Sequence, residues 1–452
     1  MELHKISEII SGIRGSEYAD LYASKAVSHS VRYDDRRMDT LSSSRGGGLG
    51  IRLIIDGNSA YAHTMGTKMS DAGAAARQAA DMSGLAIPDI KGDDDLMPEI
   101  DLSLPALDAG FLSGLDRTIR ADCKYVKQVT FGFSTSRRAI LIVKGDGSLS
   151  RDERVYTTFR VFIVLEKDGA VETGYESRSM TCGVDAFWGS DGVTPESVAM
   201  AALSRGLILL DARPCPAGTM TVLLDGTSGG AMIHEACGHG LEADIVEKDY
   251  SAFRDKIGEP VANPIITIID DATLPDEWGS YAFDDEGTPG ARNVLVENGV
   301  LKMYMTDILS ARRGDLPITG NGRRQSCGDL PLPRMSNTFV APGETSFAEM
   351  LDSMESGLLV KKMGGGEVNP TSGDYVFQVT EGYLVERGKI GPAVKGATLA
   401  GNGPETLWNI EAVGTELSLD SGYCGKGGQG VPVTDGQPSL LIKNLIVGGP
   451  ET

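Results

Sequence analysis

The chain holds only five histidines, and two of them, His234 and His239, stand five residues apart with Glu235 directly after the first. Imidazole is a common zinc ligand, so this pair could chelate one ion. In an ideal α-helix, a step of five residues would turn the second ring about 140° away from the first. Gly238 and Gly240 flank His239, and glycine frees the backbone to widen or end that turn. The spacing and the glycines together predict that both imidazoles reach one ion.

Glu235 has a different expected role from the two histidines. A hydrolytic zinc site needs an open coordination position, a base beside it and stabilisation of the developing oxyanion. Zinc lowers the pKa of its bound water to roughly 7, so a neighbouring carboxylate suffices as the base. The pattern predicts a zinc-dependent peptidase in which Glu235 activates a zinc-bound water. The alternative hypothesis is a non-catalytic adaptor or regulator that acts through protein partners and whose zinc is structural.

The third protein ligand has several candidates. Cys424 lies in the glycine-dense segment SGYCGKGGQG, which we expect to be a loop that presents a thiolate, and a His₂Cys set with one open site is chemically sensible. Cys237 is a rival inside the motif, and a closed four-ligand site containing it would favour the adaptor hypothesis. Glu242 and Asp244 are further rivals just downstream. The remaining histidines are expected to be ordinary surface or packed residues: His4, His29 and His63.

The segments before residue 210 alternate helix and hairpin patterns. Asp56-Gly57 and Asp168-Gly169 each lie between strand-like runs, which favours two-residue hairpins. Thr194-Pro195, with Glu196 in the first turn, indicates the start of a helix. The predicted elements are a helix over 2–14, a hairpin over 49–64, a helix over 70–84 opened by Ser70, a hairpin over 153–176 and a helix over 194–210.

Strand patterns dominate the second half of the sequence. The segment 211–218, DARPCPAG, contains two prolines and is predicted to separate an N-terminal mixed α/β domain (1–210) from a β-rich metallopeptidase domain (211–452). A helix that begins near Ser228 should carry the histidine motif. The 58 glycines are dispersed among apolar strands, which is typical of many tight turns. We therefore expect an α+β fold, with strands at 219–225, 358–363, 375–386 and 439–447 and a hairpin at Asn298-Gly299.

Composition limits the partners and the location. Lys and Arg total 42 against 63 Asp and Glu, and the net charge of −21 opposes direct nucleic-acid binding. The N-terminal residues lack the apolar region of a signal peptide, and no run approaches the ~20 apolar residues that a membrane span needs. The six cysteines show no CxxC pairing and are expected to be reduced. We expect a cytoplasmic protein without membrane association.

Several segments of the chain are similar to one known family. IHEACGHGLEAD at 233–244 resembles the signature of the PmbA/TldD metallopeptidases, also labelled modulators of DNA gyrase. Four further blocks agree in order: DDEGTPGARNVLVENGVLK at 284–302, GNGRRQS at 320–326, PLPRMSNTFV at 331–340 and the segment 422–449, which opens with GYCGKGGQG. The resemblance spans the C-terminal half and is fainter before residue 200, where it rests on GLGIRLIIDG at 48–57.

The resemblance implies a zinc site formed by the two motif histidines and a distant cysteine, which falls on Cys424. Because the chain retains the whole HExxxH motif, it resembles the catalytic, TldD-type members rather than paralogues that have lost it. The implied substrates are small or unfolded peptides. The implied assembly is a homodimer or a heterodimer with an inactive PmbA/TldE-type paralogue. One departure is Cys237, which stands where an apolar residue is expected.

Substrate binding could involve arginines in the segments that carry the resemblance, because a guanidinium recognises carboxylates bidentately. Ion pairing on a strongly acidic protein is the alternative role for these side chains. Extended peptides could also add as a strand to an exposed sheet edge of the β-rich domain. The candidate residues are Arg292, Arg334 and Asn337, together with Arg323 and Arg324.

Overall fold

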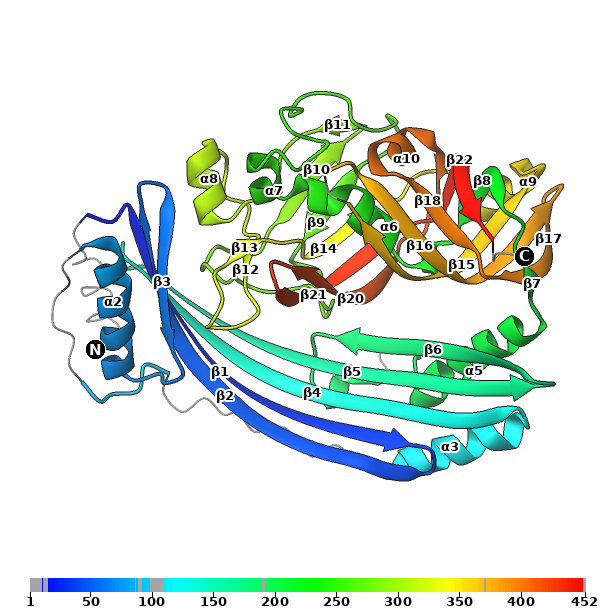
Figure 1. Cartoon of the computed structure of the whole chain (residues 1–452), viewed down its shortest axis with the longest axis horizontal. Helices are drawn as coiled ribbons and strands as arrows, with labels where there is room; N and C mark the ends of the chain where they lie inside the picture. The colour runs from blue at the N-terminus through cyan, green and yellow to red at the C-terminus, as the bar shows by residue number, and fades with distance from the viewer. Residues whose placement is uncertain are drawn as a thin grey trace.

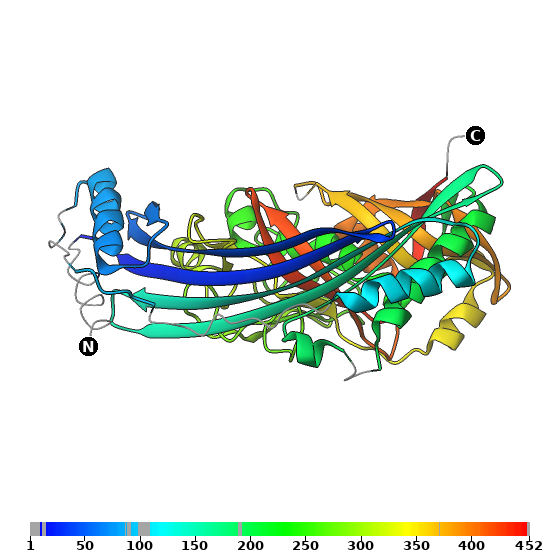
Figure 2. The ribbon, with the colours of Figure 1, turned by 90° about the horizontal axis from the view of Figure 1, so that it is seen from below.

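The computed structural model describes residues 10, 15–85, 87, 92–97, 109–188, 192–369 and 371–449. The predicted helix over 2–14 falls, except for residue 10, outside these residues. The N-terminal half is built on one six-stranded antiparallel sheet, whose long strands curve along one side of the molecule (Figures 1 and 2). In sheet order the strands are β3 (Asn58–Thr64), β2 (Arg37–Ile55), β1 (Tyr18–Asp34), β4 (Val126–Lys144), β5 (Leu149–Lys167) and β6 (Ala170–Met180).

Both predicted hairpins of this half are confirmed. Asp56 and Gly57 have φ of 48° and 68°, and Asp168 and Gly169 have φ of 52° and 85°. A two-residue turn with φ positive at both positions matches the twist of antiparallel strands, and Asp-Gly adopts it at low cost. The same geometry joins β10 (Arg292–Glu297) to β11 (Val300–Leu301), as predicted at Asn298-Gly299.

The helices of the N-terminal half lie at the two ends of the sheet (Figure 1). Helix α5 (Pro195–Asp211) begins as predicted, because the Thr194 hydroxyl accepts the Ser197 N–H at 3.1 Å. Helix α2 (Met69–Ser83) begins one residue earlier than predicted: Lys68 is its N-cap, and the Asp71 carboxylate accepts the Lys68 N–H. The other helices are α3 (Gly110–Asp122) and the short α4 (Val184–Phe187).

The C-terminal half contains two further large sheets and the main hydrophobic core. One sheet has the order β11, β10, β9 (Ile268–Asp271), β14 (Asn337–Val340), β21 (Gln429–Gln437) and β20 (Ser418–Lys426). In the other, pairing of β15 (Ser356–Val368) with β16 (Asp374–Glu386) closes these two strands with β8 (Gly218–Leu224), β22 (Leu440–Gly448) and β18 (Thr398–Asn402) into a small barrel. The strands predicted at 219–225, 358–363, 375–386 and 439–447 are present as β8 (Gly218–Leu224), β15 (Ser356–Val368), β16 (Asp374–Glu386) and β22 (Leu440–Gly448).

The remaining strands and helices complete these layers. The strands are β7 (Arg213–Pro214), β9 (Ile268–Asp271), β12 (Gly322–Arg323), β13 (Leu332–Pro333), β14 (Asn337–Val340), β17 (Lys389–Lys395), β18 (Thr398–Asn402), β19 (Ile410–Val413), β20 (Ser418–Lys426) and β21 (Gln429–Gln437). The helices are α6 (Ala231–Ile233), α7 (Ala243–Glu247), α8 (Ile308–Gly314), α9 (Phe347–Ser353) and α10 (Gly403–Asn409). The fold is therefore α+β, with an antiparallel N-terminal sheet and a β-rich C-terminal half. Among the helices within the described residues, none is long and apolar enough to span a membrane.

A buried charge network joins the two halves. The Arg52 guanidinium on β2 binds Asp20 and, at 2.6 Å, the Glu286 carboxylate, and every one of these side chains is at most 1% exposed. Arg154 on β5 lies 3.1 Å from the Asp285 carboxylate. Asp285 and Glu286 belong to the DDEG segment of the C-terminal half, so the N-terminal sheet is anchored to that half by paired, desolvated charges.

Candidate metal centre

The histidine motif lies on an irregular helical segment that follows α6. Residues His234–Gly238 form a π-turn, in which the His239 N–H donates to the His234 carbonyl, and His239–Leu241 form a 3₁₀ turn. The wider π-turn changes the angular step between the two imidazoles, whose ring centroids lie 5.1 Å apart with the planes at 87°. The predicted departure from a regular helix is confirmed.

The two glycines of the motif serve packing rather than backbone freedom. Gly238 has φ of −53° and ψ of −54°, an ordinary helical conformation open to any residue. A Cβ atom at Gly238 would lie 2.2 Å from the Met335 sulfur, and one at Gly240 would lie 2.8 Å from the Phe253 ring. The prediction that these glycines are needed for backbone freedom was therefore wrong, although the widened turn itself is present.

Cys424 reaches the histidines from a distant part of the chain. It lies on strand β20 rather than in a loop, and the glycines provide the following turn to β21 at Gly427-Gly428, where φ is 58° and 77°. The Cys424 Sγ is 3.3 Å from Nε2 of His239. Potential ligand atoms of His234, His239 and Cys424 all lie within 4.8 Å of one another. The three side chains thus converge on one point, as a metal site requires.

Each histidine is oriented by a carboxylate on its other ring nitrogen. Nδ1 of His234 lies 2.6 Å from the Asp435 carboxylate, and Nδ1 of His239 lies 2.9 Å from the Glu242 carboxylate. Carboxylates in this position fix the ring and leave Nε2 for a metal. Glu242, a rival ligand by sequence, is engaged in this supporting role.

The charges of the site favour a thiolate. Burial alone would raise the pKa of Cys424, but His234 and His239 outweigh it and lower the pKa to about 5. Burial alone would lower the pKa of His239, but the Glu242 and Cys424 groups raise it to about 10. The thiolate is the form of cysteine that binds metals, so the donor set suits a soft cation such as zinc.

Glu235 lies beside the three convergent side chains. Its Oε2 is 3.8 Å from Nε2 of His239, and a quarter of its side chain is exposed. Burial raises the pKa of Glu235, while the two histidines lower it. Glu235 lines a cleft of about 350 Å³ together with His239, Cys424 and, on the remaining walls, Ile245, Glu367, Val368, Tyr423, Gly425 and Lys426. A carboxylate therefore faces solvent-accessible space next to the candidate metal position.

The remaining rival ligands are engaged elsewhere. The Cys237 thiol is buried and donates to the Ile233 carbonyl at 3.1 Å, and burial raises its pKa to about 12. Asp244 pairs with the Lys426 ammonium at 2.6 Å. In the part of the chain that the structure describes, His234, His239 and Cys424 form the group that could hold a metal. His29 and His63 lie on β1 and β3, outside this group, and His4 lies outside the described residues.

The residues predicted to bind substrate do not line this cleft. Arg334 is fully buried and donates to the carbonyls of Cys424 and Gln429. Asn337 is also fully buried and bonds Asp271, Gly279 and Ser280. A side chain without exposed surface cannot grip a peptide, so these two have internal roles.

The other three arginines are also placed elsewhere. Arg323 donates to the Met335 carbonyl and lies over the Tyr281 ring, and Arg324 packs against Tyr22. Arg292 is exposed, 3.9 Å from the Asp271 carboxylate, and is absent from the cleft walls.

Sequence reasoning missed two residues of the site, Asp435 and Lys426. Both lie on the β20–β21 hairpin, which the sequence analysis did not predict. The Gly427-Gly428 dipeptide was the available signal, because such a pair between strand-like runs favours a two-residue turn. The hairpin would have placed Lys426 two residues from Cys424 on one strand and Asp435 on the paired strand, opposite Asp420.

Comparison with known proteins assigns the whole described architecture to one family. Three family models match: PmbA/TldA metallopeptidase domain 1 over 19–83, the central domain over 98–210 and the C-terminal domain over 217–449. A Haemophilus influenzae protein named Metalloprotease TldD homolog is 42% identical, covering 74% of this chain and 70% of the relative. A Methanothermobacter thermautotrophicus metalloprotease is 33% identical and covers 96% of both chains.

Two further similarities concern the metal and the fold. A Saccharolobus solfataricus relative, 35% identical over 52% of each chain, is named a zinc metalloprotease TldD homolog. The crystal structure of TldE from Thermococcus kodakarensis superposes with a TM-score of 0.75 at 19% identity and covers 99% of both chains. At this low identity the structural likeness supports the fold alone.

Proposed function

Because this chain belongs to the PmbA/TldD metallopeptidase family, we propose that it is a zinc-dependent peptidase that hydrolyses small or unfolded peptides. The observation that carries the proposal is the convergence of His234, His239 and Cys424 beside Glu235 at the wall of an open cleft. A structural zinc site would need a fourth protein ligand, and Cys237, the candidate for that role, bonds the Ile233 carbonyl instead.

The donor set fits zinc. Two imidazoles and one thiolate are ligands that zinc accepts, and three protein ligands leave one position open for catalysis. Both imidazoles are already oriented by Asp435 and Glu242, so little reorganisation is needed for metal binding. When bound, zinc supplies polarisation of the scissile carbonyl and a water of lowered pKa.

Glu235 acts as the general base in this proposal. Its carboxylate accepts the proton that the attacking water loses, and it donates this proton to the amide nitrogen as the C–N bond breaks. The peptide and one water then become a carboxylic acid and an amine. The burial that raises the pKa of Glu235 makes its carboxylate a stronger base than a fully solvated one.

An extended peptide is the substrate form that suits the site. Strand β20 is the outermost strand of its sheet within the described residues, and it carries Cys424. A peptide added along this edge would bond through its main chain and pass the cleft next to Glu235. Folded proteins have few extended segments free to pair in this way, which favours small or unfolded substrates.

The proposal includes assembly and location. We expect a homodimer, or a heterodimer with an inactive PmbA/TldE-type paralogue, in the cytoplasm, without direct nucleic-acid contact. The acidic composition supports the last point, since a net charge of −21 repels phosphate backbones. Size measurement of the purified protein, alone and mixed with such a paralogue, separates the two assemblies.

The test of the catalytic role is Glu235→Gln. This change keeps the shape and removes the base, so the variant should retain zinc and lose cleavage of an unfolded peptide by at least a hundredfold, within the range typical of general-base removal. Metal content and initial rates are measured on the same preparation. Cleavage at the parent rate would overturn the role of Glu235.

A further inference from the structure

Arg334 lies directly beneath the hairpin that carries Cys424. It follows β13, and its backbone N–H donates to the Asn321 carbonyl. Its Nη2 donates to the Cys424 carbonyl at 2.5 Å and its Nη1 to the Gln429 carbonyl at 3.2 Å. These two acceptors lie on β20 and β21, on either side of the turn. One guanidinium therefore holds both strands of the hairpin, at Cys424 on β20 and at Gln429 beside the turn on β21.

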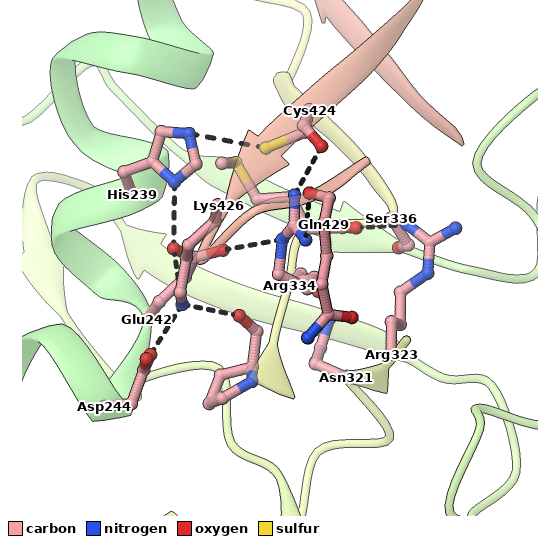
Figure 3. A network of polar contacts seen from close by, with 12 residues as sticks. His239, Glu242, Asp244, Asn321, Arg323, Arg334, Ser336, Cys424, Lys426 and Gln429 are labelled. Atoms are coloured by element: carbon pink, nitrogen blue, oxygen red, sulfur yellow. Dashed lines mark hydrogen bonds and ion pairs between the residues drawn. The ribbon is translucent and has the colours of Figure 1, made fainter. Parts of the chain in front are cut away.

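The third edge of the same guanidinium faces Glu242. Nε of Arg334 is 4.0 Å from Glu242 Oε1, and both side chains are fully buried. Neither of these two atoms has a hydrogen-bond partner among the described residues, so the guanidinium and the carboxylate interact here through their opposite charges alone. The other oxygen of Glu242 holds Nδ1 of His239 at 2.9 Å. Figure 3 shows this chain of contacts from His239 through Glu242 to Arg334 and Cys424.

Lys426 stabilises the Glu242 oxygen that faces away from Arg334. Its ammonium donates to Glu242 at 3.0 Å, to Asp244 at 2.6 Å and to the Pro333 carbonyl at 2.8 Å (Figure 3). Lys426 therefore balances the charge of Glu242, but its side chain makes none of its bonds to the backbone of Cys424. Arg334 is the residue that contacts both the backbone of Cys424 and the carboxylate that orients His239.

We infer that Arg334 is a positioning residue that sets the separation of Cys424 and His239 and so pre-forms the metal site. These two side chains belong to segments 185 residues apart in sequence, and their relative position must be fixed to a fraction of an ångström for both to bind one ion. A rigid, planar guanidinium holds the two carbonyls at a fixed angle while it lies against the Glu242 carboxylate, whereas a lysine ammonium is a flexible point charge without a preferred plane. The inference rests on the proposed zinc site and assigns Arg334 no contact with substrate.

The experiment compares zinc affinity in Arg334→Met, Arg334→Lys and the parent by competition with a chelator. Removal of partners that hold metal ligands in place typically weakens metal binding by 10–100-fold, so we expect a loss in that range for Arg334→Met. Arg334→Lys keeps a charge near Glu242 but replaces the planar fork of donors by one shorter, flexible ammonium, so its loss of zinc affinity should be smaller than that of Arg334→Met. Cobalt substitution adds a second readout, because the thiolate-to-cobalt absorption of both variants should shift.

Arg323→Met is the matched control. Arg323 is equally buried and belongs to the same part of the chain, but it donates to the Met335 carbonyl and lies over the Tyr281 ring. Its loss should lower stability without changing the affinity for zinc or the cobalt spectrum. Thermal unfolding of the metal-free proteins shows which variants fold. If Arg334→Met does not fold, the zinc affinity of Arg334→Lys tests the positioning role.

Two results would overturn the inference. Unchanged zinc affinity and cobalt spectrum in the folded Arg334 variants would reduce Arg334 to a purely structural residue. A raised KM for peptide with unchanged zinc affinity would assign it to substrate binding instead. The parent protein separates this inference from the proposed function: a parent that binds no zinc contradicts the proposed function, whereas equal zinc binding by parent and variants contradicts only the role of Arg334.

Discussion

Asp435 holds Nδ1 of His234 at 2.6 Å, although the two residues are 201 positions apart in the sequence. Asp435 lies on β21, the strand that pairs with β20 and its Cys424. One hairpin therefore contributes a candidate ligand directly and orients another through a carboxylate. The sheet that contains this hairpin, rather than the motif helix alone, determines the geometry of the candidate metal centre.

Asp435→Asn tests this orienting contact. The amide oxygen can still accept from Nδ1, but the negative charge that strengthens the imidazole as a ligand is lost. We expect zinc affinity to fall about tenfold, at the lower end of such supporting effects. Asp435→Ala should lower zinc affinity further, because Nδ1 of His234 then loses its carboxylate partner. Chelator competition measures both, and equal affinity in all three proteins would contradict the role of Asp435.

Cys424→Ser should abolish tight zinc binding, because a hydroxyl is a far weaker ligand than a thiolate for a soft cation. Cys237→Ala is the matched control, since Cys237 is equally buried and three residues from His234 but bonds the Ile233 carbonyl. We expect it to retain one zinc per chain and to lose about 1 kcal/mol of stability. Metal analysis of both purified variants checks this, and zinc loss in Cys237→Ala would instead favour a closed structural site.

Local patterns predicted those parts of the fold whose causes are local. Asp56-Gly57 and Asp168-Gly169 form hairpins because two adjacent residues adopt positive φ, and α5 begins directly after Thr194 because the Thr194 hydroxyl caps the helix. These effects involve residues that are neighbours in the sequence, so a short stretch of sequence is enough to predict the turn or the helix start. The start of α2 was missed by one residue because Asp71 caps Lys68 from inside the helix.

The candidate metal centre was only partly predictable, since most of its contacts are non-local. The His234 and His239 pair was visible in the spacing, and chemistry together with the family resemblance favoured Cys424. The internal roles of Arg334 and Asn337 depend on complete burial, which no local pattern around them reveals. Gly238 was interpreted through backbone freedom, whereas its real constraint is the Met335 side chain, almost a hundred residues away.

Arg52→Met should lower the free energy of unfolding by more than the loss of an exposed ion pair does. Arg52 balances the carboxylates of Asp20 and Glu286 in the buried charge network, and breaking such a pair from one side typically costs about 3–5 kcal/mol. Lys443→Ala is the control, because the Lys443–Glu411 pair is about half exposed and should contribute less than about 1 kcal/mol. Denaturant unfolding of the metal-free proteins gives both values. A similar loss in the two variants would contradict the anchoring role of Arg52.

The Asp225 carboxyl should make the stability of the fold depend on pH. Burial alone would raise its pKa, but the Lys361 ammonium and the Thr227 hydroxyl and N–H lower it below the ordinary value. A carboxyl whose pKa is depressed by folding stabilises the native state above its unfolded pKa of about 3.9, and this stabilisation is lost as the pH falls towards the folded value. Asp225→Asn should lower the melting temperature at pH 7 and flatten its decline below about pH 4. Thermal unfolding from pH 7 to 3 checks this, and parallel curves for parent and variant would contradict it.

Tyr423 should contact the substrate without affecting the metal. It precedes Cys424 on β20, so its side chain points to the opposite face of the strand; the residue is 60% exposed and belongs to the cleft wall. The Trp278 ring supports it edge-on at 5.7 Å. A peptide added along β20 presents alternate side chains to this face, so Tyr423 should favour apolar or aromatic side chains there.

The matched variants are Tyr423→Ala and Tyr423→Phe. Loss of the ring should raise KM for a peptide with an aromatic side chain near the scissile bond by about tenfold, equivalent to about 1.4 kcal/mol of binding. The Phe variant keeps the ring and should behave like the parent. Zinc content should be the same in all three proteins, because Tyr423 faces away from the histidines. If KM is unchanged in Tyr423→Ala over a set of peptides with varied side chains, the substrate does not run along this face of β20.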